Sequence, residues 1–305
     1  MFDIVVIGAG PGGYTAALYA ARAGFSVLVL EKMTPGGQMG TTDVIDNYPG
    51  FPEGVGGFDL AMQMKQGAER FGVKTKMAAV RSVELGEDVK KVITAKEEIE
   101  AKAVIIATGA HPRPLDIERE AELVGKGVSY CATCDGMFFK GKDVAVVGGG
   151  NTAVSDVLYL AKICRKVYLI HRRDELRASR IYRKTLESLE NVELVLNSEV
   201  TQLQAEQKVS AVSVKNKVSG DVRELPVEGL FIAVGNIPNS ELFSGQLNMD
   251  ENGYILADET TKTSIPGVFA VGDVRKKALR QVITAAADGA VASYFAEEYF
   301  NEKIL

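Results

Sequence analysis

The chain has 305 residues, of which 46% are hydrophobic and 25% are charged, and its formal net charge at pH 7 is -5. This length and balance are typical of a globular protein of about two domains, and the negative charge argues against nucleic acid as a partner. No apolar run approaches the roughly 20 residues that cross a bilayer, and no basic leader precedes the first strand-like run. We therefore expect a cytoplasmic protein with no membrane partner.

The N-terminal part of the chain has the pattern of a nucleotide-binding β-α-β unit. Residues 2–7 predict a buried strand, residues 11–23 predict an alanine-rich helix that ends at Gly24, and residues 26–30 predict a second strand. Glu31 follows that strand, 23 residues beyond the first glycine of the intervening loop, where dinucleotide-binding folds carry an acid for the ribose. Strand, helix and acid in this register favour a nucleotide site over a chance match.

The loop between the first strand and the first helix is Gly8-x-Gly10-x-x-Gly13. Gly8 allows a tight turn, Gly10 lets main-chain N–H groups approach a pyrophosphate, and Gly13 lets the helix lie close to the strand. The N-terminus of the helix, which begins at Pro11, adds partial positive charge. Because an acid at the ribose suits a nucleotide whose ribose carries no phosphate, we expect FAD at this first site.

A second unit of the same kind lies in the middle of the chain. Residues 143–147 predict a strand, residues 151–163 predict a helix and residues 166–170 predict another strand, around the loop Gly148-x-Gly150-x-x-Ala153. The candidate cofactor contacts in this loop are Gly148, Gly150, Asn151 and Thr152. Two such units predict an α/β protein with two Rossmann-like nucleotide-binding domains.

The second unit lacks the ribose-binding acid. The residue 23 positions beyond Gly148 is His171, and Arg172, Arg173 and Arg177 follow it. A guanidinium pair offers bidentate hydrogen bonds to a ribose 2′-phosphate, so we assign NADPH to this site. The alternative is that this segment is only a solvated charged surface, which its position at the end of the second strand makes less favourable.

The motif Cys131-Ala132-Thr133-Cys134-Asp135-Gly136 lies between the two glycine loops. A C-x-x-C pair indicates either zinc binding or redox chemistry. Zinc needs four ligands, and besides Cys164 the chain has only two histidines, His111 and His171, so we favour redox chemistry and no metal. We interpret Cys164, which ends an apolar helical stretch, as a small core residue.

Asp135 follows the second cysteine of this motif. A carboxyl group at this position can pass a proton as thiol and thiolate interconvert, which disulfide exchange requires. The alternative is a structural role as a helix N-cap, for which aspartate is a common choice.

Together the motifs make the chain similar to the low-molecular-weight, bacterial-type thioredoxin reductases over essentially its whole length. The residues that carry this resemblance are Gly8-Ala9-Gly10-Pro11-Gly12-Gly13, Gly36-Gly37-Gln38, Asn47-Tyr48-Pro49-Gly50, Ala107-Thr108-Gly109-Ala110, Cys131 to Gly136, His171-Arg172-Arg173-Asp174, Gly272-Asp273-Val274 and Arg280-Gln281. The resemblance implies the class II pyridine nucleotide-disulfide reductase fold. It implies a discontinuous FAD domain, residues 1–112 and 241–305, and an inserted NADPH domain, residues 113–240, that carries the cysteine pair.

The resemblance also implies roles for single residues. The implied FAD contacts are Gly8, Gly10, Pro11, Gly13, Glu31, Lys32, Gly36, Gly37, Gln38, Asn47, Val80, Ala107, Thr108, Gly109, Gly272, Asp273, Arg280, Gln281 and Val282. Cys134 would interact with the flavin and Cys131 would attack thioredoxin, so that electrons pass from NADPH through FAD and the cysteine disulfide to a small disulfide protein. The family further implies a homodimer and a rotation of one domain against the other about residues 109–114 and 235–239.

The chain departs from many family members at two places: Ser155-Asp156 replaces a pair of acids, and Glu175-Leu176 stands where an aromatic residue is frequent. One alternative function is a related flavoprotein that serves another thiol protein or takes electrons from ferredoxin or NADH. A reductase that feeds a peroxidase usually carries an additional N-terminal thioredoxin-like segment, which we do not expect before Gly8. A second alternative is a redox sensor without catalysis, for which the sequence shows no separate output domain.

Overall fold

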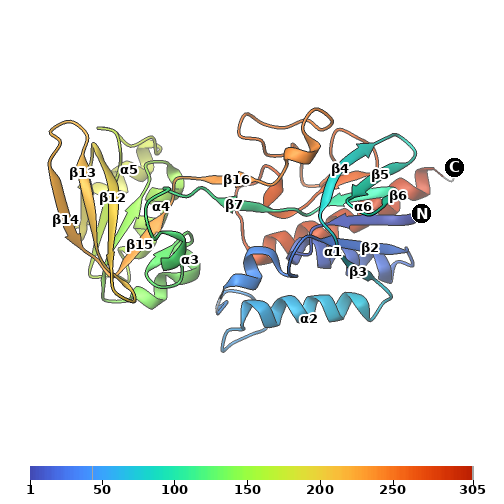
Figure 1. Ribbon diagram of the computed structural model, residues 1–305, viewed down its shortest axis with the longest axis horizontal. Coiled ribbons are helices and arrows are strands. Elements are labelled where there is room, and N and C mark those ends of the chain that lie inside the picture. The colour runs from blue at the N-terminus through green and yellow to red at the C-terminus, as the bar shows by residue number, and fades with distance from the viewer. Residues whose placement is uncertain (43, 304–305) are drawn as a thin grey trace. The chain divides into compact units, whose positions relative to one another are not determined.

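The computed structural model describes residues 1–42 and 44–303. The chain divides into two compact units, of which the first comprises Met1–His111 with Ile237–Leu305 and the second comprises Pro112–Asn236 (Figure 1). The first unit is therefore discontinuous and the second is inserted into it. Sequence analysis placed the two crossings after residues 112 and 240, which is one and four residues later.

The first unit contains a seven-stranded sheet. Its strands are β1 (Phe2–Ile7), β2 (Val27–Glu31), β3 (Lys74–Met77), β4 (Val80–Leu85), β5 (Lys90–Thr94), β6 (Glu98–Ile106) and β17 (Val268–Ala270). The order is β3-β2-β1-β6-β5-β4, and β17 pairs in parallel with the last residues of β6. The β-α-β unit expected from the sequence forms its centre, because β1 pairs in parallel with both β2 and β6. The carboxyl ends of these parallel strands lie at one edge of the sheet.

Helices α1 (Pro11–Arg22), α2 (Gly57–Glu69) and α6 (Val282–Glu302) complete the first unit. Small residues let α1 and α6 approach closely: a Cβ on Gly289 of α6 would lie 2.3 Å from the carbonyl oxygen of Gly12 in α1. One apolar core lies between these helices and the sheet, and a second covers the opposite face with residues from β4, β5 and the segment 243–255. Within the described ranges, no helix combines the length and apolar character needed to cross a bilayer.

The second unit repeats the parallel plan with a five-stranded sheet of order β11-β10-β9-β15-β8. Its strands are β8 (Val128–Ser129), β9 (Asp143–Val147), β10 (Lys166–Ile170), β11 (Val192–Val195) and β15 (Gly229–Ile232), and its helices are α3 (Ala132–Asp135), α4 (Asn151–Leu160) and α5 (Arg180–Glu187). A three-stranded antiparallel sheet of β12 (Ser198–Ala205), β13 (Val209–Asn216) and β14 (Val222–Pro226) completes it. The α/β fold with two Rossmann-like units is thus confirmed.

Helix α4 ends earlier than the sequence predicts, at Leu160 and not at Ile163. The N–H groups of Lys162 and Ile163 donate to the carbonyls of Tyr159 and Leu160, three residues back, so the last turn is tighter than an α-helix. Cys164 and Arg165 then connect this turn to β10.

The two segments that join the units pair with each other as a short two-stranded sheet of β7 (Ala110–Pro112) and β16 (Asn236–Pro238) (Figure 1). On the side of the first unit, Asn239 exchanges hydrogen bonds with Thr108: the Thr108 hydroxyl donates to the Asn239 carbonyl at 2.6 Å, and the Asn239 amide donates to the Thr108 carbonyl at 2.8 Å. These two hydrogen bonds therefore hold the turn after β6 against the segment that follows β16.

Candidate functional site

The first glycine loop joins β1 to α1 at the carboxyl edge of the sheet. Gly8 has φ 106°, and a Cβ there would lie 2.4 Å from the carbonyl oxygen of Ala107, while a Cβ on Gly13 would lie 2.0 Å from the carbonyl oxygen of Gly8. A Cβ on Gly10 would meet nothing within 4 Å. The loop is therefore closely packed at Gly8 and Gly13 and open at Gly10. Because the N-cap residue Gly10 has no side chain with which to cap α1, the helix N-terminus can receive an anion.

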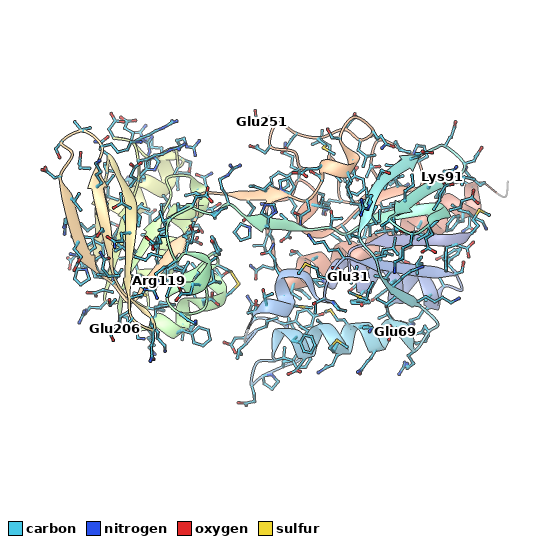
Figure 2. All side chains as sticks on the ribbon, viewed as in Figure 1. Glu31, Glu69, Lys91, Arg119, Glu206 and Glu251 are labelled. Carbon is cyan, nitrogen blue, oxygen red and sulfur yellow. A yellow bond between two sulfur atoms is a disulfide. The ribbon has the colours of Figure 1, made fainter. Side chains whose placement is uncertain are left out.

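Glu31 stands beside this loop at the end of β2 (Figure 2). Its carboxylate accepts hydrogen bonds from the main-chain N–H groups of Ala9, at 3.0 Å, and Met33, at 3.1 Å. The N–H group of Ala78 donates to the Glu31 carbonyl at 2.7 Å, which brings the segment before Val80 to the same place. Two main-chain donors thus orient the acid toward the glycine loop, and the remaining lone pairs of a half-buried carboxylate can accept ribose hydroxyl groups.

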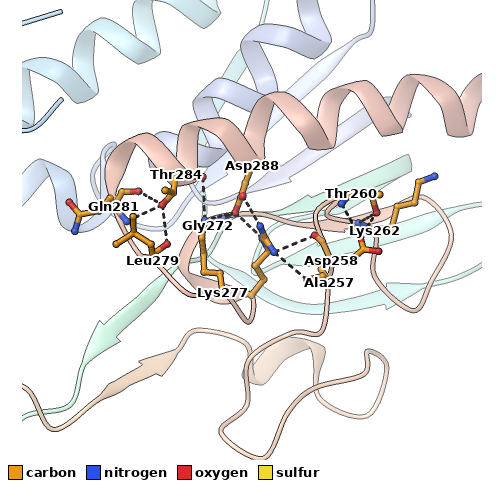
Figure 3. A network of polar contacts seen from close by, with 11 residues as sticks. Ala257, Asp258, Thr260, Lys262, Gly272, Lys277, Leu279, Gln281, Thr284 and Asp288 are labelled. Carbon is orange, nitrogen blue, oxygen red and sulfur yellow. Dashed lines mark hydrogen bonds and ion pairs between the residues drawn. The ribbon is translucent and has the colours of Figure 1, made fainter. Parts of the chain in front are cut away.

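The late Gly-Asp turn is η5 (Gly272–Val274), and a buried ion cluster holds it against α6 (Figure 3). The carboxylate of Asp288 accepts the main-chain N–H of Gly272 at 2.8 Å, two bonds from the Arg275 guanidinium at 2.8 and 2.9 Å, and one from the Lys277 ammonium at 2.8 Å. Burial alone would raise the pKa of Asp288, but these hydrogen bonds lower it below its usual value. The cluster therefore contains an ionised carboxylate with two buried cations, and it fixes the turn that precedes α6.

Two buried polar atoms near this turn have no hydrogen-bond partner among the described residues: Oδ1 of Asp273 and Nε of Arg280. Burial raises the pKa of Asp273, and the positive charge of Arg280 opposes that rise. Buried polar atoms normally find a partner, so an unsatisfied acceptor and an unsatisfied donor at one turn indicate a ligand with hydroxyl and phosphate groups. Together with the open glycine loop and Glu31, they fit FAD.

The structure also joins other residues that the sequence assigned to this cofactor. The Asn47 amide donates to Oε1 of Gln281 at 2.9 Å, although 234 residues separate them. The Gln38 amide donates to the carbonyl of Ala110, so η1 (Gly37–Thr41) lies against the first residue of β7. Gln281 is the N-cap of α6 and shares a capping box with Thr284. These contacts bring segments from both ends of the first unit to the carboxyl edge of its sheet.

The second glycine loop joins β9 to α4. A Cβ on Gly148 would lie 2.5 Å from the carbonyl oxygen of Ala233, whereas one on Gly150 would meet nothing within 4 Å. His171 lies under this loop, because a Cβ on Gly149 would lie 2.2 Å from its ring. His171 is 5% exposed, and burial lowers the pKa of its imidazole below the usual value, which favours the neutral form. His171 therefore supports the loop, and its role as a cofactor contact stays a prediction.

The arginines after His171 lie close enough to its imidazole for their positive charges to help lower its pKa. The main-chain N–H of Arg177 donates to the carbonyl of Gly149 at 2.7 Å, and the N–H of Ser179 donates to the Asn151 side chain at 2.9 Å. Among the side chains that the structure describes, none forms an ion pair or hydrogen bond with the exposed guanidinium groups of Arg172, Arg173 and Arg177. A cluster of unpaired cations beside a nucleotide loop fits the 2′-phosphate of NADPH.

The cysteine pair lies at the start of α3 in the second unit. Cys131 and Cys134 form a disulfide with 5.3 Å between their Cα atoms, and Cys131 is the N-cap of the helix. The hydroxyl of Thr133 lies 3.5 Å from Sγ of Cys131. Cys164, by contrast, is a buried free thiol that donates to the carbonyl of Phe139, as expected for a core residue.

Asp135 is the last residue of α3 and also the N-cap residue of the following 3-10 helix, η3 (Gly136–Phe139), but its side chain makes no capping hydrogen bond there. Its main-chain N–H donates to the carbonyl of Cys131 at 3.1 Å, and its carboxylate accepts the hydroxyl of Ser129 at 2.6 Å. The same hydroxyl oxygen accepts the N–H of Cys131 at 3.1 Å. Sequence analysis missed Ser129, because a serine two residues before a cysteine carries no signal of its own. Only the turn of the chain at Cys131 brings its hydroxyl to the carboxylate.

A disulfide with an adjacent carboxyl group, together with two nucleotide loops, defines a nucleotide-dependent disulfide oxidoreductase. The family model for pyridine nucleotide-disulphide oxidoreductases matches residues 2–289. The chain is 45% identical to a thioredoxin reductase of Mycolicibacterium smegmatis, over 99% of this chain and 97% of that protein, and 41% identical to one of Bacillus subtilis, over 99% and 96%. The crystal structure of thioredoxin reductase from Streptococcus pyogenes superposes with a TM-score of 0.91 at 43% identity and covers 99% of each chain. The chain therefore belongs to the thioredoxin reductases of this oxidoreductase family.

Proposed function

We propose that this oxidoreductase uses NADPH and FAD to reduce the disulfide of a thioredoxin. The observation that carries the proposal is the Cys131–Cys134 disulfide beside Asp135, in a unit whose glycine loop is flanked by unpaired arginines. Both relatives described above are named thioredoxin reductase, which supports the proposed activity. In this proposal the first unit is the FAD domain and the second is the NADPH domain.

Bound FAD would supply the two-electron step between nicotinamide and disulfide. Asp273 and Arg280 would hold its hydroxyl and phosphate groups, Glu31 would accept its adenosine ribose, and the N-terminus of α1 would face its pyrophosphate. Arg172, Arg173 and Arg177 would select NADPH over NADH by pairing with the 2′-phosphate. The hinge role of the joining segments and a homodimeric assembly are parts of the same proposal and rest on the family resemblance.

Thiol–disulfide exchange between the reduced protein and thioredoxin needs no further oxidant or reductant. The Cys131 thiolate attacks one sulfur of the thioredoxin disulfide, which forms a mixed disulfide and releases a substrate thiolate that takes up a proton. The Cys134 thiolate then attacks Sγ of Cys131, which restores the intramolecular disulfide and releases the second substrate thiolate. Asp135, one residue beyond Cys134, can take the proton of one cysteine thiol and deliver it to a departing sulfur.

The first test is Cys134→Ser, with Cys164→Ser as the matched control. Cys134→Ser should still bind FAD, which gives a yellow protein, but should lose NADPH-dependent reduction of thioredoxin completely. Cys164→Ser should keep that activity, because its thiol is buried and bonded to a carbonyl. Turnover by Cys134→Ser would contradict the proposed electron path.

The electron donor is tested by stopped-flow bleaching of the flavin with NADPH and with NADH. Arg173→Ala should weaken NADPH binding at least tenfold and leave NADH nearly unaffected, because a hydrogen bond to a charged group contributes about 1.5–3 kcal/mol. A wild-type preference for NADH, or an equal effect of the variant on both nucleotides, would contradict the assignment of the arginines.

A further inference from the structure

Ser129 connects the redox disulfide to the carboxyl group beside it. It is the last residue of β8, and only 4% of it is exposed. Its hydroxyl lies between the main chain of Cys131 and the carboxylate of Asp135. The contact is well ordered, because the side chain is buried and its hydroxyl forms hydrogen bonds with both residues.

The directions of the hydrogen bonds of Ser129 follow from the numbers of protons and lone pairs on its hydroxyl group. A serine hydroxyl has one proton to donate and two lone pairs to accept with. The N–H of Cys131 can only donate, so one lone pair of Ser129 accepts it at 3.1 Å. The single proton can go to Asp135 at 2.6 Å or to the carbonyl of Cys131 at 3.3 Å. The shorter bond to a carboxylate is the stronger one, so the proton points to Asp135.

The arrangement ties the position of Asp135 to that of Cys131 in two ways. The Asp135 main chain is bonded to the carbonyl of Cys131, and the Asp135 side chain is bonded through Ser129 to the N–H of Cys131. The carboxylate is thereby held to the residue whose sulfur exchanges with the substrate. A donor on one carboxylate oxygen also favours the ionised form, which is the form that accepts a proton from a thiol.

We infer that Ser129 is a positioning residue for proton transfer, which orients Asp135 and favours its ionised form. The inference rests on the proposed function. Reduction of the Cys131–Cys134 disulfide to two thiols takes two electrons and two protons: the hydride of NADPH brings both electrons and one proton, and solvent supplies the other proton. Asp135 exchanges protons with the sulfurs, and Ser129 sets the pH range over which it does so.

The experiment is a single-turnover pH profile. The FAD-containing protein is reduced with one equivalent of NADPH and mixed with oxidised bacterial thioredoxin between pH 5.5 and 9, and the rate of exchange is recorded. Asp135→Asn identifies the limb of the profile that belongs to Asp135, because that limb disappears. Ser129→Ala should shift the same limb to higher pH by about one unit, since a carboxylate that loses a hydrogen-bond donor takes up a proton more readily.

Ser198→Ala is the matched control. Ser198 is also 4% exposed and lies in the same unit, and its hydroxyl donates to the carbonyl of Leu196. It should leave the profile unchanged. Ser129→Thr keeps the hydroxyl and should keep the wild-type limb, so it provides a second test if the alanine variant fails to fold.

The outcomes separate the inference from the function on which it rests. If the wild-type protein does not reduce thioredoxin with NADPH, the proposed function fails. If it does, and Ser129→Ala shows the wild-type limb or Ser129→Thr shows a displaced one, the role of Ser129 is overturned. Flavin bleaching by NADPH should proceed at the wild-type rate in Ser129→Ala, and a loss of that step would indicate general structural damage and also overturn the inference.

Discussion

A half-buried carboxyl group on α4 should make the stability of the second unit depend on pH. Asp156 shares a helix face with Tyr159 and Leu160, which together with Ile163 of the following turn lie against Gly136 at the end of α3. No other side chain that the structure describes forms a hydrogen bond or ion pair with its carboxyl group. Burial raises the pKa of Asp156 from 3.8 to about 7. We expect Asp156→Asn to stabilise the protein above neutral pH.

The sign and size of the effect follow from proton linkage. In the unfolded chain the carboxyl group ionises above pH 3.8, and in the folded protein only above about 7, so folding takes up a proton between these values. Stability therefore falls as pH rises from about 4 to about 7 and then levels off. At about 1.36 kcal/mol per pH unit the upper limit is about 4 kcal/mol, and because Asp156 keeps some contact with water we expect about 1–3 kcal/mol.

Urea unfolding at pH 5 and pH 8, followed by far-ultraviolet circular dichroism, measures the effect. Asp156→Asn should raise the free energy of unfolding by about 1 kcal/mol or less at pH 5 and by about 1–3 kcal/mol at pH 8, because the amide stays neutral at both values. Asp174→Asn changes an exposed aspartate of the same unit and should alter stability by less than about 0.5 kcal/mol. A gain for Asp156→Asn that is equal at both pH values, or larger at pH 5, would refute the reasoning.

Three further substitutions test buried polar contacts and close packing. Asp288→Asn should destabilise the protein by about 3–5 kcal/mol and loosen FAD, because two buried cations lose their carboxylate; FAD retention on gel filtration is the readout. Tyr299→Phe should cost about 1–3 kcal/mol, since the fully buried Lys90 ammonium loses a partner at 3.0 Å, whereas the exposed Tyr294→Phe should cost little in the same urea titration. Gly149→Ala should cost about 1–3 kcal/mol and weaken NADPH binding, because its Cβ would overlap a buried imidazole.

The parts of the fold that the sequence predicts are those whose signal is local. The strands at residues 2–7, 143–147 and 166–170 have the predicted bounds, because each ends in a run of four apolar residues that is followed by glycine or histidine. The hairpin of β4 and β5 and the antiparallel sheet of β12, β13 and β14 were not predicted. Their residues alternate only in part between buried and exposed positions, and β-bulges interrupt the pairing of β4 with β5 and of β12 with β13.

Some residues of the candidate sites can likewise be predicted from local sequence, and others cannot. A glycine loop, a terminal acid and a C-x-x-C motif are readable because spacing along the chain sets their geometry. The hydrogen bond from Asn47 to Gln281, by contrast, joins residues 234 positions apart, and only the resemblance to a family placed both at one cofactor. Contacts that depend on how distant segments meet leave no periodic trace in a single sequence.

The polar residues that hold the sites in place were the least predictable. Glu120 is 4% exposed and accepts the hydroxyl of Tyr130, next to Cys131, at 2.6 Å, while its carboxylate also binds the N–H groups of Leu115 and Ile117. The neighbouring Arg119 has φ 65° and donates to the carbonyls of Ala205 and Glu206 (Figure 2). A non-glycine residue in the left-handed region persists only where its surroundings hold it. No sequence motif distinguishes Glu120, Ser129 or Asp288 from other polar residues of the chain. Each can be recognised as a support for a site only when its hydrogen-bond partners are known.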